Sequence, residues 1–516
     1  MTEKAKKDIL EYLQCMVNTE TPTPPKIVND MLDLIPESVW LDDNAKILCP
    51  ACKDGIFLRE ASLRILRKKY ETMGPTEFRK HQDDITDHIL RNRMFGIAIS
   101  YRGYRVTKRS LYTCSDKYSN IDNIFFDESL GRYVKDKDGK EVEKQCFHFI
   151  ENIDEVSKFF EGKGVKDMQF DVIIGNPPYQ ESDGGGTGDS AKPIYNKFIQ
   201  QAKTLNPAYI CMIVPSRWMK GGKGLDSFRE EMINDTRISH IVDYANASEC
   251  FPLIHLDGGV CYFLWNNLHN NELSYTYHTL DGESFTTERY LKNEVSDTVI
   301  RDIRQLSIIK KTADKKETKF SNIVSARKPY GIGADFFNFP DRYPDIKQQT
   351  EKTVNSLTVY GVKGKKGGAR RTTSFIEKEA IKKNTHSFDK YKLFFSKAYM
   401  ATATVPPKII IGKPGEICTE TFLEIGPFNT ELEAINCLKY IQTKFYRALL
   451  FYSRHSLNIS QDSFSLIPLL DFNKDWTDKE LYKKYELTQS EIDFIEQQIK
   501  PMDNDSASAD IDTDDE

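Results

Sequence analysis

An apolar run that stops abruptly constrains the fold of this chain more than any other feature. Val172–Ile174 is a series of consecutive β-branched residues, typical of a strand buried on both faces of a parallel sheet. The run stops at Gly175, and the next four residues, Asn176–Tyr179, cannot extend the strand because two of them are prolines, which have no N–H group to give to a neighbouring strand. The pattern predicts a rigid loop over Asn176–Tyr179 at the carboxyl end of a sheet strand, where open α/β folds bind their ligands.

The residues of this loop suit methyl transfer to an exocyclic amino group. Such a nitrogen is a poor nucleophile because its lone pair is conjugated into the ring. The side-chain oxygen of Asn176 and the backbone carbonyl of Pro177 are suited to accept both amino hydrogens, which frees the lone pair for the incoming methyl group. Pro178 fixes that carbonyl, and Tyr179 offers a face on which a base stacks after leaving the duplex. An ordinary loop with a buried tyrosine is the alternative, and the preceding strand argues against it.

Several segments together resemble the adenine-N6 DNA methyltransferases of bacterial restriction-modification systems, in their Asn-Pro-Pro-Tyr, type II or IIG-like class. The segments are Asn176–Tyr179, Pro193–Tyr195, Val214–Trp218, Gly221–Gly224 and Gly258–Trp265. The similarity extends from about residue 20 to about residue 500. It implies an α/β fold with a Rossmann-like domain, S-adenosylmethionine as the methyl donor and double-stranded DNA as the partner.

The resemblance also implies a set of donor-binding residues. A helix beginning near Thr23 is expected to reach the carboxylate of the donor, and a strand, tight loop and helix over residues 46–69 should form the donor loop. The next strand is expected over residues 94–100 and a third over residues 147–154. The predicted donor-binding residues are Thr23, Pro25, Ala51, Gly55, Phe57, Ile99, Asp154 and Asn176.

Two positions depart from the family pattern. Cys49 and Ser100 stand where the family usually has acidic residues, which contact the ammonium and the ribose of the donor. A neutral thiol does not replace a carboxylate. The donor site is therefore either weakened or compensated by Asp54 within the loop.

The alternation of helices and strands continues beyond the motif. Helices are expected over 194–205 and 225–233, and strands over 209–214, 238–243 and 260–265. Phe251 is predicted to face Tyr179 across the flipped base, with an ordinary core position as the alternative. The glycine-rich segment 183–189 lacks the ending of a phosphate-binding loop, so it is not expected to bind a nucleotide triphosphate. We expect it to form a lid over the base pocket, with an ordinary surface loop as the alternative.

From residue 270 the α/β alternation is lost, and basic clusters with nearby aromatic residues appear. The predicted organisation is a methyltransferase domain over 1–269, a mixed α+β target-recognition domain over 270–475, closing helices over 476–502 and a disordered acidic tail over 503–516. Phosphate contacts are the expected role of the clusters, although a solvated loop has the same composition. The predicted DNA-binding residues are Arg327, Lys328, Lys365, Lys366, Arg370 and Arg371.

Composition permits DNA binding without requiring it. The formal net charge of the 516 residues is −5, but the last fourteen contain seven acids, without which the charge is +2. No apolar run approaches the ~20 residues of a membrane span and no signal peptide opens the chain, so we expect a cytoplasmic protein. Cys49 and Cys52 have metal-like spacing, but no second close pair accompanies them and no metal site is predicted.

These observations favour a site-specific adenine-N6 DNA methyltransferase, the modification component of a restriction system. Whether a separate restriction nuclease or helicase subunit acts as a partner is left open by the sequence. The alternatives are a bifunctional endonuclease and methylase, a non-catalytic DNA-recognition subunit, and a methyltransferase for protein glutamine or RNA guanine. A fused nuclease normally precedes such a core, and about twenty residues precede it here.

Overall fold

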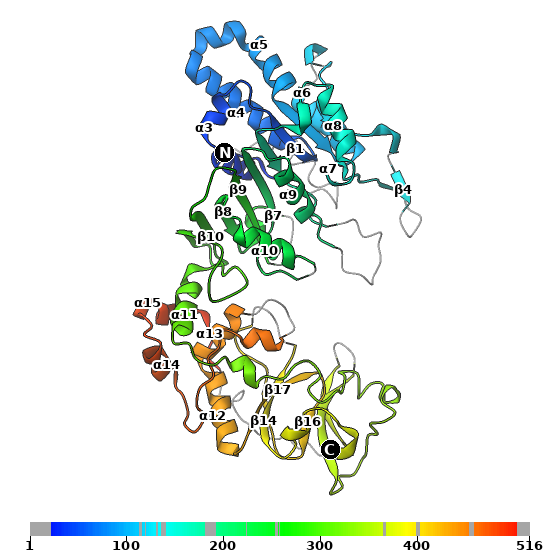
Figure 1. Ribbon diagram of the computed structural model, residues 1–516, viewed down its shortest axis with the longest axis vertical. Coiled ribbons are helices and arrows are strands. Elements are labelled where there is room, and N and C mark those ends of the chain that lie inside the picture. The colour runs from blue at the N-terminus through cyan, green and yellow to red at the C-terminus, as the bar shows by residue number, and fades with distance from the viewer. Residues whose placement is uncertain are drawn as a thin grey trace, which may run out of the picture. The chain divides into compact units, whose positions relative to one another are not determined.

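The computed structural model describes residues 22–112, 116–118, 120–130, 133–135, 141–180, 192–222, 224–252, 256, 258–364, 368–398, 403–453 and 459–502 (Figure 1). The helix expected within residues 1–20, the predicted lid at 183–189 and the acidic tail at 503–516 lie outside these residues. The chain divides into two compact units, Met1–Asn293 with Asp297–Arg301, and Glu294–Ser296 with Asp302–Glu516.

The first unit is built on a nine-stranded sheet. In spatial order its strands are β11 (Ser284–Arg289), β10 (Leu273–His278), β8 (Ile238–Tyr244), β9 (Val260–Asn266), β7 (Tyr209–Pro215), β6 (Val172–Gly175), β1 (Ile47–Cys52), β2 (Met94–Ala98) and β3 (Ile124–Phe125). The strands from β7 to β3 are parallel, whereas β9 is antiparallel to both of its neighbours. The predicted α/β, Rossmann-like fold class is confirmed.

Helices cover both faces of this sheet (Figure 1). They are α2 (Pro25–Asp33), α3 (Glu37–Leu41), α4 (Ile56–Met73), α5 (Pro75–Asn92), α6 (Tyr101–Tyr112), α7 (His148–Glu151), α8 (Ile153–Glu161), α9 (Tyr195–Thr204) and α10 (Asp226–Asn234), and a small ribbon consists of β4 (Tyr133–Lys135) and β5 (Glu141–Glu143). Alternate residues of β6 enter different cores. Val172 and Ile174 belong to the cluster that includes α2 and α4, whereas Ile173 belongs to the cluster that includes α8, α9 and α10.

The sheet continues past residue 269, where the sequence predicted the end of the first domain. β10 pairs in parallel with β8, and β11 pairs with β10. The polar, alternating composition of these two strands indicated a new domain, but both belong to the same sheet. The first unit therefore extends about twenty residues further than predicted.

The strand expected over residues 147–154 is wrong. The segment forms α7 and the start of α8, and β3 instead occupies the place beside β2. Val156 and Phe160 are four residues apart on α8, so they lie on one side of that helix, and both are fully buried in one core with Phe149 of α7. The prediction of a strand missed this helical spacing.

The second unit combines two three-stranded sheets with helices. One sheet has the order β13 (Arg370–Glu377), β12 (Ser356–Lys363), β16 (Glu416–Cys418), and the other β15 (Ile410–Gly412), β14 (Tyr391–Ser396), β17 (Phe422–Phe428). The helices are α11 (Ile303–Asp314), α12 (Glu431–Gln442), α13 (Lys444–Ser453), α14 (Asp478–Lys484) and α15 (Gln489–Gln498). The two closing helices expected over 476–502 are α14 and α15, which contact α13 and thus belong to this unit.

A buried ion pair connects the ends of several strands in the first unit. Asp243, at the end of β8, is fully buried and accepts hydrogen bonds from Ser216 (2.6 Å) and Tyr275 (2.7 Å). Arg301 donates to both oxygens of Asp243, at 2.5 and 2.6 Å, and to the carbonyl of Gly258, at 2.6 Å. The pair thus holds together the loops that follow β7 and precede β9.

Asp243→Asn should lower the free energy of unfolding of the first unit by about 3–5 kcal/mol, because the Arg301 guanidinium would lose its only buried counter-charge in this network. Chemical denaturation measures the change. Glu77→Gln is the matched control, since Glu77 is half exposed in its pairs with Lys80 and His81, and its loss should stay below about 1 kcal/mol. Equal losses in the two variants would contradict the prediction.

Candidate active site

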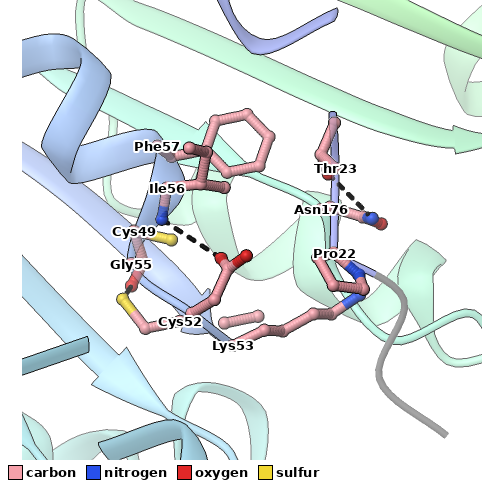
Figure 2. A pocket seen from close by; sticks show the side chains of 11 residues that line it. Pro22, Thr23, Cys49, Cys52, Lys53, Gly55, Ile56, Phe57 and Asn176 are labelled. Carbon is pink, nitrogen blue, oxygen red and sulfur yellow. Dashed lines mark hydrogen bonds between the residues drawn. The ribbon is translucent and has the colours of Figure 1, made fainter. Parts of the chain in front are cut away.

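A pocket lies beside the start of α4, where β1 and β6 end (Figure 2). It is lined by Pro22, Thr23, Cys49, Ala51, Cys52, Lys53, Asp54, Gly55, Ile56, Phe57 and Asn176. Three segments that are far apart in sequence therefore meet here, near residues 22, 54 and 176. Five of the predicted donor-binding residues are among the lining residues: Thr23, Ala51, Gly55, Phe57 and Asn176.

Gly55 turns the chain from β1 into α4. Its φ of 77° lies in the left-handed region, which glycine adopts without strain. A side chain there would also press against α6, since an ideal Cβ atom would lie 3.1 Å from the Cα atom of Thr107. The fold thus requires glycine at the position predicted for the donor loop.

The carboxylate of Asp54 is buried beside this turn. One oxygen, Oδ1, accepts a hydrogen bond from the backbone N–H of Ile56 at 3.1 Å. The other, Oδ2, has no hydrogen-bond partner among the described residues, and Asp54 is only 8% exposed. Burial raises the pKa of the Asp54 carboxyl above its usual value. The pocket therefore contains an acceptor atom that the described residues leave without a partner.

Asn176 connects the motif loop to the N-terminal segment. Its Nδ2 atom donates a hydrogen bond to Thr23 Oγ1 at 3.1 Å, and both residues are buried (Figure 2). This bond sets the orientation of the amide group, because the nitrogen is held on the side of Thr23. The side-chain oxygen is consequently directed away from Thr23.

Tyr179 presents a partly exposed ring with a buried hydroxyl group. The ring packs edge-on against Tyr195 with centroids 6.4 Å apart, and Lys53 Nζ lies 5.9 Å from its centroid. The hydroxyl has no hydrogen-bond partner in the described part of the chain, and burial raises its pKa well above the usual value. Only the ring of Tyr179 is therefore available to a ligand.

Phe251, the predicted second wall of the base pocket, is 2% exposed and belongs to the core cluster that includes α2 and α4. Its backbone N–H donates to the carbonyl of Ala247 at 2.8 Å. The ring contact described for Tyr179 is with Tyr195. A role for Phe251 in base stacking stays a prediction.

The two positions that depart from the family pattern differ in their surroundings. Cys49 lines the pocket and is 2% exposed. Ser100 does not line it, and its hydroxyl accepts a hydrogen bond from the N–H of Gly103 at 3.0 Å in the first turn of α6. Ser100 therefore stabilises a helix end, and only Cys49 bears directly on the pocket.

Three predicted donor-binding residues are not among those that line the pocket. Pro25 is the first residue of α2, and Ile99 is a buried residue just after β2. Asp154 is exposed in the first turn of α8, because the segment is helical. Their roles stay predictions. Lys53 lines the pocket but was not predicted, although its position two residues before Gly55 could have indicated it.

Cations of the second unit converge on the carboxylate of Glu420. Arg327 Nε pairs with Oε1, and Lys397 Nζ lies 3.0 Å from the same oxygen. Lys328 Nζ lies 3.7 Å from Oε2. Three cations around one carboxylate leave a local excess of positive charge, and the Arg327 side chain is 73% exposed. The fold therefore joins two basic clusters that are some seventy residues apart in sequence.

Two further predicted DNA-binding residues, Arg370 and Arg371, lie on β13. Arg370 and Arg371 are exposed at the start of β13, and Arg371 Nη2 donates to the carbonyl of Lys408 at 2.7 Å. Lys365 and Lys366 lie outside the described residues. Contacts of all four with DNA stay predictions.

Neither a membrane span nor a metal cluster is found in the described parts of the chain. None of the described helices is long and apolar enough to cross a bilayer. No group of three or more His, Cys, Asp or Glu side chains among the described residues is arranged to hold a metal ion.

Several solved structures of restriction-modification enzymes are similar to this chain at low sequence identity. The type IIL enzyme MmeI in complex with DNA has a TM-score of 0.43 at 12% identity, over 86% of this chain and 63% of that one. The type IIG endonuclease BpuSI has a TM-score of 0.42 at 12% identity, over 95% and 65%. A nuclease-deletion mutant of the type ISP enzyme LlaGI, with a DNA substrate mimic, has a TM-score of 0.45 at 10% identity, over 90% and 54%. The chain thus spans about half to two thirds of each.

Sequence comparison identifies the family. Residues 92–251, which include the motif loop, match the Eco57I restriction-modification methylase family. An uncharacterized adenine-specific methylase of Mycoplasma pneumoniae is 30% identical over 368 residues, which are 63% of this chain and 85% of the relative. The chain therefore belongs to the adenine-specific methylases.

Proposed function

We propose that this chain transfers a methyl group from S-adenosylmethionine to the N6 atom of adenine at a specific site in duplex DNA. The observation that carries the proposal is the hydrogen bond from Asn176 to Thr23, which orients the motif amide at the edge of the pocket. The adenine-specific relative favours this substrate over protein glutamine or RNA guanine. A separate nuclease or helicase subunit stays a prediction.

The residues that line the pocket fit the amino-acid part of S-adenosylmethionine. Lys53 and Asp54 supply one positive and one negative charge, and the left-handed turn at Gly55 brings backbone close to the pocket. When bound, the donor supplies a methyl group already activated by its sulfonium. The work left to the protein is to bind, orient and polarise.

Asn176 and Pro177 polarise the amino group of the target base. Thr23 holds Nδ2 of Asn176, so Oδ1 is directed away from it and accepts one amino hydrogen. The carbonyl of Pro177, held in a buried loop of two prolines, accepts the other. Both contacts draw electron density toward the nitrogen, and because neither group has to reorganise, they favour the transition state.

Tyr179 supplies the surface on which the extruded base stacks. The edge-on contact with Tyr195 and the burial of the hydroxyl fix the plane of its ring. A fixed ring loses little conformational freedom when the base stacks on it. A base that has left the duplex regains part of its lost stacking energy in this way.

The second unit recognises the DNA. Arg327, Lys328 and Lys397 carry more positive charge than Glu420 neutralises, and Arg370 and Arg371 add two exposed cations at one end of β13. Contacts to phosphates position a protein on the duplex without reading its sequence. These residues therefore place the DNA, and other side chains of the unit select the site.

Asn176→Ala should reduce methylation by about a hundredfold or more, as expected when one preorganised hydrogen-bonding group is removed from a transition state. Sequencing that detects N6-methyladenine, applied to DNA of a host expressing either form, measures the change. Asn270→Ala, at an exposed position bonded to Thr236, is the matched control and should leave methylation intact. Comparable methylation by Asn176→Ala and the parent would refute the proposed function.

Tyr179→Ala should weaken binding of the flipped base by about 1–3 kcal/mol through lost stacking. Tyr179→Phe should stay within about twofold of the parent, because the hydroxyl makes no hydrogen bond in the described part of the chain. The kcat/KM for methylation and the fluorescence of 2-aminopurine at the target position measure both effects. A phenylalanine variant as impaired as the alanine variant would show that the hydroxyl, not the ring, is required.

Affinity for DNA falls as the salt concentration rises. Arg327→Ala should make the plot of log affinity against log salt concentration less steep by about 1, as the loss of one phosphate contact does. Binding isotherms at several salt concentrations measure the slope. Lys439→Ala is the control in the same unit, because Lys439 forms a half-exposed pair with Asp475 at 3.0 Å away from this cluster. If both slopes equal that of the parent, Arg327 does not contact phosphate.

A further inference from the structure

Asp54 combines three properties that a purely structural aspartate rarely has together. It is 8% exposed, its Oδ2 atom has no hydrogen-bond partner among the described residues, and it lines the pocket. Burying a carboxylate is unfavourable unless both of its oxygens have hydrogen-bond or ion-pair partners. A cation that enters the pocket would supply the missing partner.

We propose that Asp54 binds the α-ammonium group of the methyl donor through Oδ2. This inference rests on the proposed function, since it takes S-adenosylmethionine as the donor. Cys49, another residue that lines the pocket, does not carry the negative charge that this contact needs. The inference therefore assigns the contact to the carboxylate of Asp54. Asp54 is then a specificity-determining residue for the amino-acid part of the donor.

The local geometry prepares Asp54 for this contact. The N–H of Ile56 holds Oδ1 at 3.1 Å, so the carboxylate cannot rotate freely and Oδ2 keeps one direction. The left-handed turn at Gly55 fixes the backbone that carries both groups. A charge-assisted hydrogen bond to a preorganised acceptor is roughly twice as strong as a neutral one.

The charge pattern of the pocket matches a zwitterion. Of the lining residues, Lys53 and Asp54 carry the formal charges, one of each sign and adjacent in sequence. Burial raises the pKa of the Cys52 thiol well above its usual value, so this neighbour stays neutral. The amino-acid part of the donor carries one ammonium and one carboxylate, which Asp54 and Lys53 complement.

The competing explanation is that Asp54 only stabilises the start of α4 through Ile56. Asp54→Asn separates the two roles, because asparagine keeps an oxygen for the N–H of Ile56 but loses the negative charge. Calorimetric titration with S-adenosylmethionine and with 5′-methylthioadenosine provides the comparison. The second compound has the adenosine and sulfur but neither ammonium nor carboxylate.

Asp54→Asn should bind S-adenosylmethionine about tenfold or more weakly than the parent, as expected for a lost charge-assisted hydrogen bond. Its affinity for 5′-methylthioadenosine should stay within about twofold, and its melting temperature should be unchanged. Asp43→Asn is the matched control, since Asp43 is an exposed partner of Lys69 outside the pocket, and it should alter neither affinity.

Two results would overturn the assignment to Asp54. Unchanged affinity for S-adenosylmethionine would show that Oδ2 does not meet the ammonium. An equal loss for both compounds would show that Asp54 acts through the structure of the loop. A parent protein that binds neither compound would instead refute the donor assignment itself, and with it the proposed function and this inference together.

Discussion

The burial of β6 on both faces of the sheet is the constraint on which the rest of the site depends. Its residues alternate between two cores, so the strand can neither slip by one residue nor tilt without exposing apolar side chains. Gly175 and the two prolines after it therefore emerge at one defined place. The neighbouring strand β1 is buried along its whole length and ends beside them, which brings the donor loop to the motif loop.

The buried polar groups of the first unit are of two kinds, which differ in how many of their atoms form hydrogen bonds or ion pairs. Asp243 and Arg301 satisfy one another and several loops, so their charges are fully used in holding the structure. Only one oxygen of Asp54 has a hydrogen-bond partner among the described residues, and Asn176 uses its nitrogen to fix its orientation. Saturated polar networks stabilise a fold, whereas a buried carboxylate with one unpaired oxygen at the edge of a pocket provides binding capacity.

Short sequence patterns predicted the strands and loops whose conformation is determined by the residues within them. The β-branched run before Gly175 and the prolines after it are sufficient to place β6 and the motif loop. Residues 147–154 were misassigned because the helical spacing that buries Val156 and Phe160 of α8 continues beyond that segment. The end of the first domain was placed too early because β10 and β11 are only partly buried, and their membership of the sheet is decided by the pairing of β10 with β8 and of β11 with β10.

Contacts between segments that are far apart in the chain could not be predicted from the sequence. The convergence of Arg327 and Lys397 on Glu420 depends on where β14 and β17 meet, and no spacing rule contains that information. The same holds for Ser100, whose role at the start of α6 follows from the position of a helix end. The resemblance supplied the donor-site candidates, and the structure distinguishes those that line the pocket from those that do not.

The hydrogen bond between Thr23 and Asn176 has a consequence for folding order. It joins residues 153 positions apart, and closing a loop of that length costs about 4 kcal/mol or more of chain entropy. One hydrogen bond contributes about 1 kcal/mol, so it cannot drive this closure. It forms only after the sheet has assembled and the segment before α2 has docked on it. The chain thus reaches its topology first, and the amide of Asn176 acquires its direction last.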